Sequence, residues 1–248
     1  MKNKRPYVLT IAGFDPSGGA GLVADLKTFE NLKCYGLSVC TANTIQNDMD
    51  FVNCHWMPIQ QIKAQIEVLF NRFKIDFVKI GIVENWMVLQ SIIDLLYKRS
   101  PEVKIILDPV LKSSSSFEFH GSETLPDELL FQLFLITPNY DEIQQLYKGL
   151  SIAETIARIT SKTNLLLKGG HRSNNKGYDQ LVTHQGKSYG FRPQLKNITE
   201  KHGSGCVLSS AITAHLALGY PLLKACYRGK KYTEQVLSSN PGLLGYHK

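Results

Sequence analysis

The chain has 248 residues, a formal net charge of +7 and an apolar fraction of 43%, which favours one large α/β domain over residues 1–248 with a continuous core. The charge is mild and forms no long basic run, so nucleic-acid binding is not indicated, and no apolar run approaches the ~20 residues of a membrane span. The five scattered cysteines, none in a Cys-x-x-Cys pair, argue against a disulfide framework and a structural zinc site. Because no signal-peptide pattern is present either, we expect a cytoplasmic protein that attracts acidic small molecules.

Short apolar runs alternate with amphipathic ones along the chain, the pattern typical of parallel strands joined by helices. This order predicts a three-layer α/β/α sandwich with a mostly parallel central sheet, and ligand-binding loops at the carboxyl ends of its strands. The most loop-like interior segment is residues 112–116. Strands are predicted over residues 7–12, 36–44, 77–80, 104–107, 133–136 and 165–168, with a hairpin over 179–192. Helices are predicted over residues 21–32, 58–72, 85–98, 140–146, 151–162, 205–218 and 222–237.

A glycine-rich turn over residues 15–21 follows the first predicted strand and leads into a helix. It lacks the Gly-Lys-Ser/Thr ending of a P-loop and the glycine spacing of a dinucleotide fingerprint. The turn is therefore either a plain tight turn or a ligand cradle of another kind. Asp25 lies one turn into the helix, where it faces either solvent or a pocket beside the turn.

A second glycine-rich stretch, residues 202–206, joins a turn to a helix of small apolar residues. Gly203 and Gly205 allow the backbone N–H groups around Ser204 to converge on one point, and a helix start favours a phosphate there. The positive dipole end of the helix also predicts a lowered pKa for the thiol of Cys206, which makes Cys206 a candidate base. The alternative is a helix cap with Cys206 as a small buried filler. Two glycine-rich helix starts also predict two ligand groups held close together.

Polar residues follow three of the predicted strands. Asp108 ends one strand and is a candidate metal or phosphate-side carboxylate. Asn139 and Glu142 have the spacing of a helix-capping box, and Glu142 with Asp108 could instead hold a hydrated Mg²⁺ ion. Lys168 ends another strand, where it is either a phosphate ligand or a solvated lysine.

Taken together, these motifs resemble the hydroxymethylpyrimidine/phosphomethylpyrimidine kinases of the ribokinase-like superfamily. The resemblance runs in order from about residue 7 to about residue 235. It implies a ribokinase-like fold and two successive ATP-dependent phosphorylations in thiamin biosynthesis, of 4-amino-5-hydroxymethyl-2-methylpyrimidine and then of its monophosphate. The motifs that carry the resemblance are residues 10–21, 24–29, 46–47, 79–81, 107–110, 136–142, 168–171 and 202–206.

The resemblance implies a catalytic role for the second glycine-rich stretch. Cys206 would accept the proton of the substrate hydroxyl, while Gly203, Ser204 and Gly205 would hold the migrating phosphoryl group. Most ribokinase-like sugar kinases have aspartate at the base position, so the cysteine favours the pyrimidine kinases.

The resemblance also implies ATP and Mg²⁺ as cofactors. Asp108 and Glu142 would lie near the metal, and Asn139, Glu142 and Lys168 would contact the nucleotide. A homodimer is expected, because this family is commonly dimeric.

The resemblance further implies a pocket for the aminopyrimidine. Asp25 and Gln46 match the residues that hydrogen-bond the ring, and a carboxylate with a primary amide suits its donors and acceptors. Gly13 would line the pocket, and Ile82 and Val110 would form its apolar walls. Gln46 favours the pyrimidine over pyridoxal, since pyridoxal kinases often lack glutamine there.

The chain departs from the family pattern at several positions. Ser204 replaces threonine, which keeps the backbone N–H groups that would hold the phosphoryl group. Ile82 replaces methionine, which keeps the apolar wall of the expected pyrimidine pocket. Lys201 replaces threonine in the more divergent segment 198–202, and the segment 238–248 is short, which affects the expected nucleotide contacts. A pyridoxal kinase and a non-catalytic pyrimidine-binding protein are the alternative functions.

Overall fold

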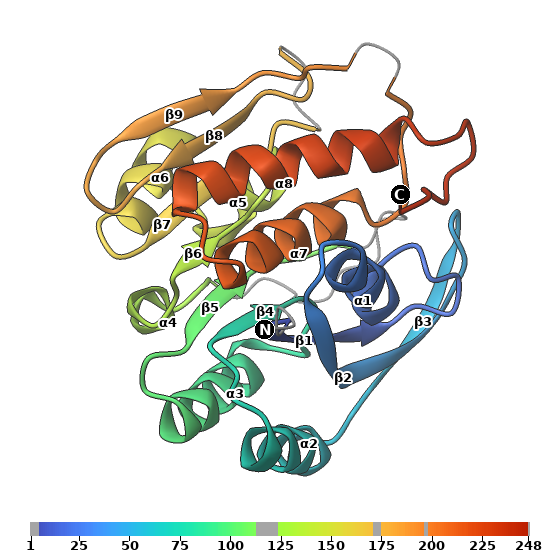
Figure 1. The fold of residues 1–248 in the computed structure, drawn as a ribbon. Helices are drawn as coiled ribbons and strands as arrows, with labels where there is room; N and C mark the ends of the chain where they lie inside the picture. The colour runs from blue at the N-terminus through green and yellow to red at the C-terminus, as the bar shows by residue number, and fades with distance from the viewer. Residues whose placement is uncertain (1–4, 113–123, 171–174, 196–197, 248) are drawn as a thin grey trace.

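The sheet is the central layer of the computed structural model, which describes residues 5–112, 124–170, 175–195 and 198–247 (Figure 1). The described strands form one sheet in the order β3-β2-β1-β4-β5-β6-β7-β8-β9. Neighbours from β2 to β7 pair in parallel, and the remaining pairs at both edges are antiparallel, which confirms the predicted sheet. The strands are β1 (Tyr7–Phe14), β2 (Tyr35–Gln46), β3 (Phe51–Trp56), β4 (Phe77–Ile80), β5 (Lys104–Leu107), β6 (Leu135–Ile136), β7 (Asn164–Leu167), β8 (Asp179–Val182) and β9 (Ser188–Phe191).

Helices cover both faces of the sheet, as predicted for a three-layer sandwich. In Figure 1, α7 and α8 lie side by side with α1 next to α7, while α2 and α3 lie across the sheet from them. None of the described helices combines the length and apolar character that crossing a membrane requires. The helices are α1 (Gly21–Asn31), α2 (Ile59–Arg72), α3 (Trp86–Arg99), α4 (Asp127–Phe131), α5 (Tyr140–Leu146), α6 (Ile152–Thr160), α7 (Ser204–Ala217) and α8 (Leu222–Leu237).

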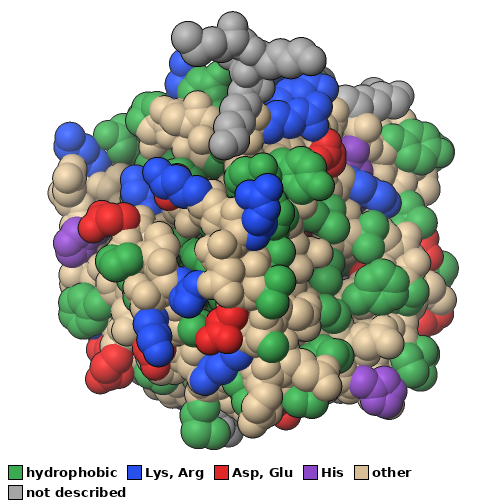
Figure 2. Space-filling model, turned by 60° about the horizontal axis from the view of Figure 1, so that its bottom comes forward, with side chains coloured by type: hydrophobic (Ala, Val, Ile, Leu, Met, Phe, Trp, Pro, Cys, Tyr) green, Lys and Arg blue, Asp and Glu red, His purple; other side chains and the backbone are tan. Residues whose placement is uncertain are grey.

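The apolar runs of the strands supply two cores, because alternate side chains of a strand point to opposite faces. In β5, Ile105 and Leu107 belong to the cluster with α2 to α6, whereas Ile106 packs with Leu208 and Ile212 of α7. Among the described residues, Lys79, Lys168, Lys201 and Lys230 are buried, and the other Lys and Arg residues are half-buried or exposed. Figure 2 shows Lys and Arg interspersed with acidic and apolar side chains on the lower side of the molecule.

Two elements escaped the sequence prediction. β3 is an edge strand whose side chains are exposed or half-buried, so it shows no alternation of apolar and polar residues. α4 spans five residues after Pro126, too few for a helical period. The predicted hairpin is confirmed, with the Thr183 N–H donating to the Lys187 carbonyl across the turn at 2.8 Å. Most of the predicted loop, residues 113–116, lies outside the described residues.

Candidate active site

The two glycine-rich turns pack directly against each other. A Cβ atom on Gly203 would lie 2.0 Å from the carbonyl oxygen of Gly19, so the contact requires glycine. Gly203 also has φ of +75° as the N-cap of α7, a conformation that suits glycine. The two helix starts therefore lie next to each other, and the prediction that they hold two ligand groups close together stays a prediction.

Asp15 stabilises the contact between the two glycine-rich turns. Its Oδ2 atom accepts hydrogen bonds from the Ala20 N–H at 2.8 Å and the Ser17 hydroxyl at 2.9 Å, and lies 2.9 Å from Nε2 of His202. Burial opposes ionisation of this carboxyl, but the hydrogen bonds from His202, Ser17 and Ala20 outweigh it and lower its pKa. Asp15 thus joins the first turn of the chain to the start of α7.

The first turn of α7 lies beside charges at the ends of β5 and β7. A Cβ atom on Gly205 would lie 3.3 Å from Nζ of Lys168 and 3.8 Å from Oδ2 of Asp108. The Ser209 hydroxyl, one turn further along, donates to the same Oδ2 atom at 3.1 Å. The unpaired N–H groups of a helix start and a lysine therefore face one region, an arrangement that suits phosphate.

Lys168 lies between two carboxylates. Its Nζ atom is 2.7 Å from Oδ1 of Asp108 and 3.6 Å from Oε2 of Glu142. Burial disfavours the charge of Asp108, but Lys168 and Lys79 outweigh it and lower the pKa of Asp108. Burial raises the pKa of Glu142 to about 7, with Asp108 adding to the rise and Lys168 opposing it.

Asn139 and Glu142 form the predicted capping box at the start of α5. The Asn139 side chain accepts from the Glu142 N–H at 2.8 Å, and Oε2 of Glu142 accepts from the Asn139 N–H at 2.7 Å. The structural interpretation of this pair is confirmed. A role toward nucleotide or metal stays a prediction.

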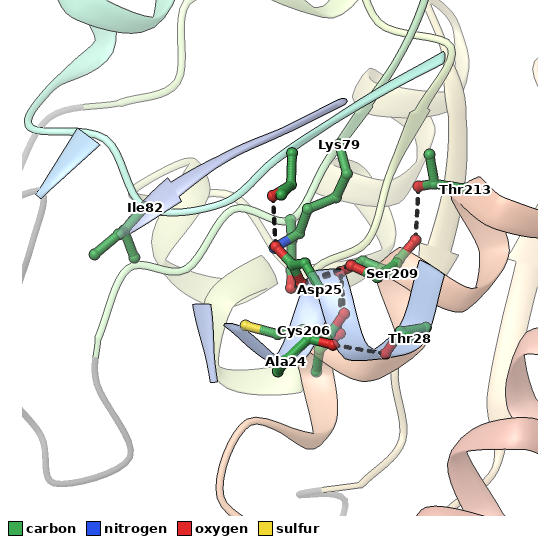
Figure 3. A network of polar contacts seen from close by, with 12 residues as sticks. Ala24, Asp25, Thr28, Lys79, Ile82, Cys206, Ser209 and Thr213 are labelled. Carbon is green, nitrogen blue, oxygen red and sulfur yellow. Dashed lines mark hydrogen bonds and ion pairs between the residues drawn. The ribbon is translucent and has the colours of Figure 1, made fainter. Parts of the chain in front are cut away.

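Asp25 is buried in a polar cluster rather than exposed. Its Oδ2 atom accepts from the Thr10 hydroxyl at 2.6 Å and the Lys79 ammonium at 2.9 Å, and its Oδ1 atom accepts from the Ser210 hydroxyl at 2.6 Å. The side chains of Asp25 and Lys79 are both 0% exposed. Figure 3 shows this cluster beside Cys206, between β1, β4, α1 and α7.

The expectation of a lowered pKa for Cys206 is wrong for this structure. Burial raises the pKa of the thiol to about 11. Lys79 and a hydrogen bond from the Gly21 N–H lower it, whereas Asp25 and Asp108 raise it further. The helix start does not compensate for the loss of water around the sulfur.

The predicted pocket residues lie at one edge of the sheet, at or just beyond the carboxyl ends of β1, β2, β4 and β5. Gly13 and Ile82 are in contact, since a Cβ atom on Gly13 would lie 2.4 Å from Cδ1 of Ile82. Gln46 is half-buried and donates to the Thr44 hydroxyl at 2.8 Å. Val110 is half-buried two residues after Asp108. Their contacts with a substrate stay predictions.

The divergent segment is tied to the end of the chain. The ammonium of Lys201 donates to the Thr199 hydroxyl at 2.5 Å and to the Asn240 carbonyl at 2.6 Å, and the His202 N–H donates to the Leu243 carbonyl at 2.9 Å. Burial lowers the pKa of Lys201. Lys201 thus serves the packing of the C-terminal segment in this structure.

No role for Lys79, Asp15 or Ser210 was predicted from the sequence. For Lys79 a signal was present, because it is a charged residue within the otherwise apolar strand β4. Asp15 and Ser210 gave no comparable signal, since aspartate is common in turns and serine is common among small helix residues.

Known proteins resemble the chain over nearly its whole length. A sequence profile of the family described as phosphomethylpyrimidine kinase matches residues 15–248. A hydroxymethylpyrimidine/phosphomethylpyrimidine kinase of Haemophilus influenzae is 34% identical, over 93% of this chain and 90% of its own. The solved phosphomethylpyrimidine kinase of Clostridium difficile is 33% identical, with a TM-score of 0.75 over 92% of this chain and 98% of its own.

A second group of solved structures shares the fold. The pyridoxal kinase of Bacillus subtilis, solved as an ADP complex, is 25% identical with a TM-score of 0.80 over 95% of this chain and 92% of its own. The family profile and the relatives from Haemophilus influenzae and Clostridium difficile are nonetheless named for the pyrimidine substrate. The chain therefore belongs to the phosphomethylpyrimidine kinase family, on the ribokinase-like fold.

Proposed function

We propose that this chain transfers the γ-phosphoryl group of ATP to the hydroxymethyl group of 4-amino-5-hydroxymethyl-2-methylpyrimidine, and then a second phosphoryl group to the monophosphate, in thiamin biosynthesis. Family membership supports the substrate class. The observation that carries the proposal is the position of Cys206 in the first turn of α7, with Lys168 and Asp108 beside that turn. A base and a phosphate site then lie next to each other.

Phosphoryl transfer depends on positioning and on stabilisation of charge. The N–H groups of Gly203, Ser204, Gly205 and Cys206 would hold the migrating phosphoryl group in line with the substrate hydroxyl. Lys168 would add positive charge beside it, because its ion pairs with Asp108 and Glu142 raise its pKa despite its burial and keep it protonated.

Cys206 would act as the base. Its thiolate takes the proton of the substrate hydroxyl and becomes a thiol, while the oxygen bonds to the γ-phosphorus and ADP leaves with the electron pair of the broken bond. With a pKa of about 11 the thiol predominates at neutral pH. The site therefore needs a positive charge that stabilises the thiolate when it forms.

Asp108 and Glu142 fit the needs of Mg²⁺. Among the described residues, no group of three or more His, Cys, Asp or Glu side chains is placed to hold a metal ion, but Mg²⁺ keeps several waters and needs only one or two carboxylates beside phosphate oxygens. Two carboxylates here share one ammonium, so one negative charge is left over once Glu142 is ionised, above its pKa of about 7. When bound with ATP, Mg²⁺ would neutralise charge on the phosphates.

Gln46 and Asp25 would recognise the pyrimidine ring, with Gly13, Ile82 and Val110 around it. Asp25 accepts three hydrogen bonds, and a carboxylate has about four acceptor positions. One acceptor position is therefore left for a further donor, such as the ring amino group, which would reach it only if the side chains that bury Asp25 move. Asn139 and Lys168 would contact the nucleotide.

We also propose a cytoplasmic homodimer. Apolar side chains are exposed on β2, β3 and the turn between them, including Ile45 at 47%, Met49 at 71% and Val52 at 70%. Apolar surface on an edge strand supports association with a second copy. Analytical ultracentrifugation of the purified chain tests this part.

Pyridoxal kinase is the second candidate, supported by structural neighbours with that activity. The test is an ATP-consumption assay with Mg²⁺ in which hydroxymethylpyrimidine, its monophosphate and pyridoxal are offered separately, with ATP alone as the blank. Turnover of both pyrimidines is expected. Turnover of pyridoxal alone would establish the second candidate, and binding without turnover of any substrate would establish a non-catalytic pyrimidine-binding protein.

A further inference from the structure

Lys79 is a charged residue in the interior of the protein. It lies in β4 between Val78 and Ile80, and all three are 0% exposed. Burying an ammonium group costs several kcal/mol unless partners compensate, so a buried lysine needs a reason. The activity proposed above gives Lys79 no part.

The ammonium of Lys79 has fewer partners than it can bind. Among the described residues its hydrogen-bond partner is Oδ2 of Asp25, at 2.9 Å, although an ammonium carries three N–H donors. The space around it is tight, since a Cβ atom on Gly81 would lie 3.0 Å from Nζ. The group is thus fixed in place with donor capacity to spare.

The Asp25–Lys79 pair is joined to the helix that carries Cys206. Asp25 accepts from Ser210 at 2.6 Å, and Ser210 lies four residues after Cys206, on the same face of α7. Figure 3 shows Cys206 next to Asp25. The pair therefore sits beside the sulfur and holds α7 in register with β4.

Charged groups from four parts of the fold act on Cys206. Lys79 comes from β4, Asp25 from α1, Asp108 from the end of β5 and Lys168 from the end of β7. Lys79 favours the thiolate of Cys206, while Asp25 and Asp108 disfavour it. Both lysines are paired, Lys168 with Asp108 at 2.7 Å and Lys79 with Asp25 at 2.9 Å, and Lys79 is the cation on the Asp25 side that favours the thiolate.

We infer that Lys79 is a positioning residue for Cys206: its buried ammonium, held in place by Asp25, supplies the positive charge that stabilises the Cys206 thiolate. The inference rests on the proposed function for its use in catalysis, but its physical content concerns the thiol alone. Its test therefore does not require turnover.

The experiment measures the rate at which iodoacetamide alkylates Cys206 between pH 6 and pH 10, followed by mass spectrometry of the peptide that contains it. Lys79→Met is expected to slow alkylation about tenfold near pH 8, because one unit of pKa changes the thiolate fraction about tenfold. Asp25→Asn is expected to accelerate it, since it removes a negative charge and keeps the lysine. A purely structural loss would move both variants in the same direction.

The double variant Asp25→Asn/Lys79→Met covers the case in which Lys79→Met does not fold, because it buries no unpaired charge. It differs from Asp25→Asn only at Lys79, so it should be alkylated about tenfold more slowly than that variant. Cys40 and Cys54, both half-buried elsewhere, are internal controls whose rates should not change.

Equal rates at Cys206 in wild type, Asp25→Asn and the double variant would overturn the inference. The assay of the wild type on both pyrimidines tests the proposed function separately. Lack of turnover with an altered alkylation rate would reject the kinase and keep the inference. Normal turnover with unaltered alkylation would keep the kinase and reject the inference about Lys79.

Discussion

The two buried ion pairs beside the start of α7 look alike but differ in charge and exposure. Asp25 and Lys79 form a neutral pair whose side chains are 0% exposed, 2.9 Å apart. Asp108 and Lys168 are 2.7 Å apart, but Glu142 adds a second carboxylate and the Lys168 side chain remains 10% exposed. The first pair is closed and balanced, whereas the second is open at Lys168 and has a surplus carboxylate that is negative once Glu142 is ionised.

The difference in exposure and charge balance suits the two carboxylate–lysine pairs to different roles. A closed, balanced pair can fix the positions of neighbouring groups and bias a thiol, but it offers no place for an external cation. An open set with a surplus carboxylate can take up a proton or a metal ion, and the raised pKa of Glu142, about 7, reflects the burial of this second carboxylate beside Asp108.

The largest effect is expected from breaking the closed pair. Lys79→Met leaves the Asp25 carboxylate buried without its cation and should lower the free energy of unfolding by about 3–5 kcal/mol. Adding Asp25→Asn should recover most of that loss. Urea denaturation of wild type, single and double variants measures this, and a double variant less stable than Lys79→Met would contradict the account.

Breaking the open pair should lower turnover as well as stability, because the buried Asp108 carboxylate loses its cation. Lys168→Met removes positive charge beside the phosphate site and should lower kcat by about 10²–10³-fold, as removal of one preorganised charge-stabilising group typically does. Lys162→Met, which removes a lysine from a partly buried ion pair with Asp127, is the matched control. Equal kcat values for the two variants would show that Lys168 acts only in packing.

A third buried carboxylate, Asp15, has hydrogen bonds where the other two have a lysine, and its replacement tests how much those hydrogen bonds stabilise the fold. Asp15→Asn should lower the free energy of unfolding at pH 7 by about 1.5–3 kcal/mol, the value of hydrogen bonds to a charged group.

The pH dependence of this loss has a defined sign. Since the folded pKa of Asp15 is below its ordinary value of 3.8, the carboxylate stabilises the fold above that value and the contribution is lost as pH falls through the folded pKa. Denaturation of wild type and Asp15→Asn at pH 7, 4 and 3 should give a difference that shrinks toward pH 3. A difference that grows on acidification would contradict the assignment.

The smallest effect concerns the surplus carboxylate. Glu142→Gln removes it and should reduce the gain in ADP affinity that Mg²⁺ provides by about tenfold, close to 1.4 kcal/mol. Glu154→Gln is a matched control, because Glu154 forms the same kind of capping box with Ser151 at the start of α6. Calorimetric titration with ADP, with and without Mg²⁺, measures both, and an equal change in the two variants would assign Glu142 to capping alone.

The sequence predicted the parts of this site that depend on chain order. Apolar strands joined by amphipathic helices predict the parallel sheet, and a parallel sheet brings Asp108 and Lys168 to one edge. The capping box of Asn139 and Glu142 is local and was also predictable.

Pairings between distant segments were not predictable in the same way. The contact of Asp25 with Lys79 spans 54 positions and depends on the register between α1 and β4, which no local pattern encodes. Lys79, a lysine in an otherwise apolar strand, was the one feature of the sequence that indicated a buried ion pair. The rise in the pKa of Cys206 also needs the packed structure, because a helix start alone predicts the opposite direction.

The most direct test of the central claim is the steady-state kinetics of Cys206→Ala with hydroxymethylpyrimidine and Mg-ATP. If Cys206 takes the hydroxyl proton, kcat should fall at least about tenfold, since a general base contributes about 10²–10⁴-fold, while KM changes little. Unchanged kcat at every pH between 6 and 9 would contradict the account and remove Cys206 from the reaction.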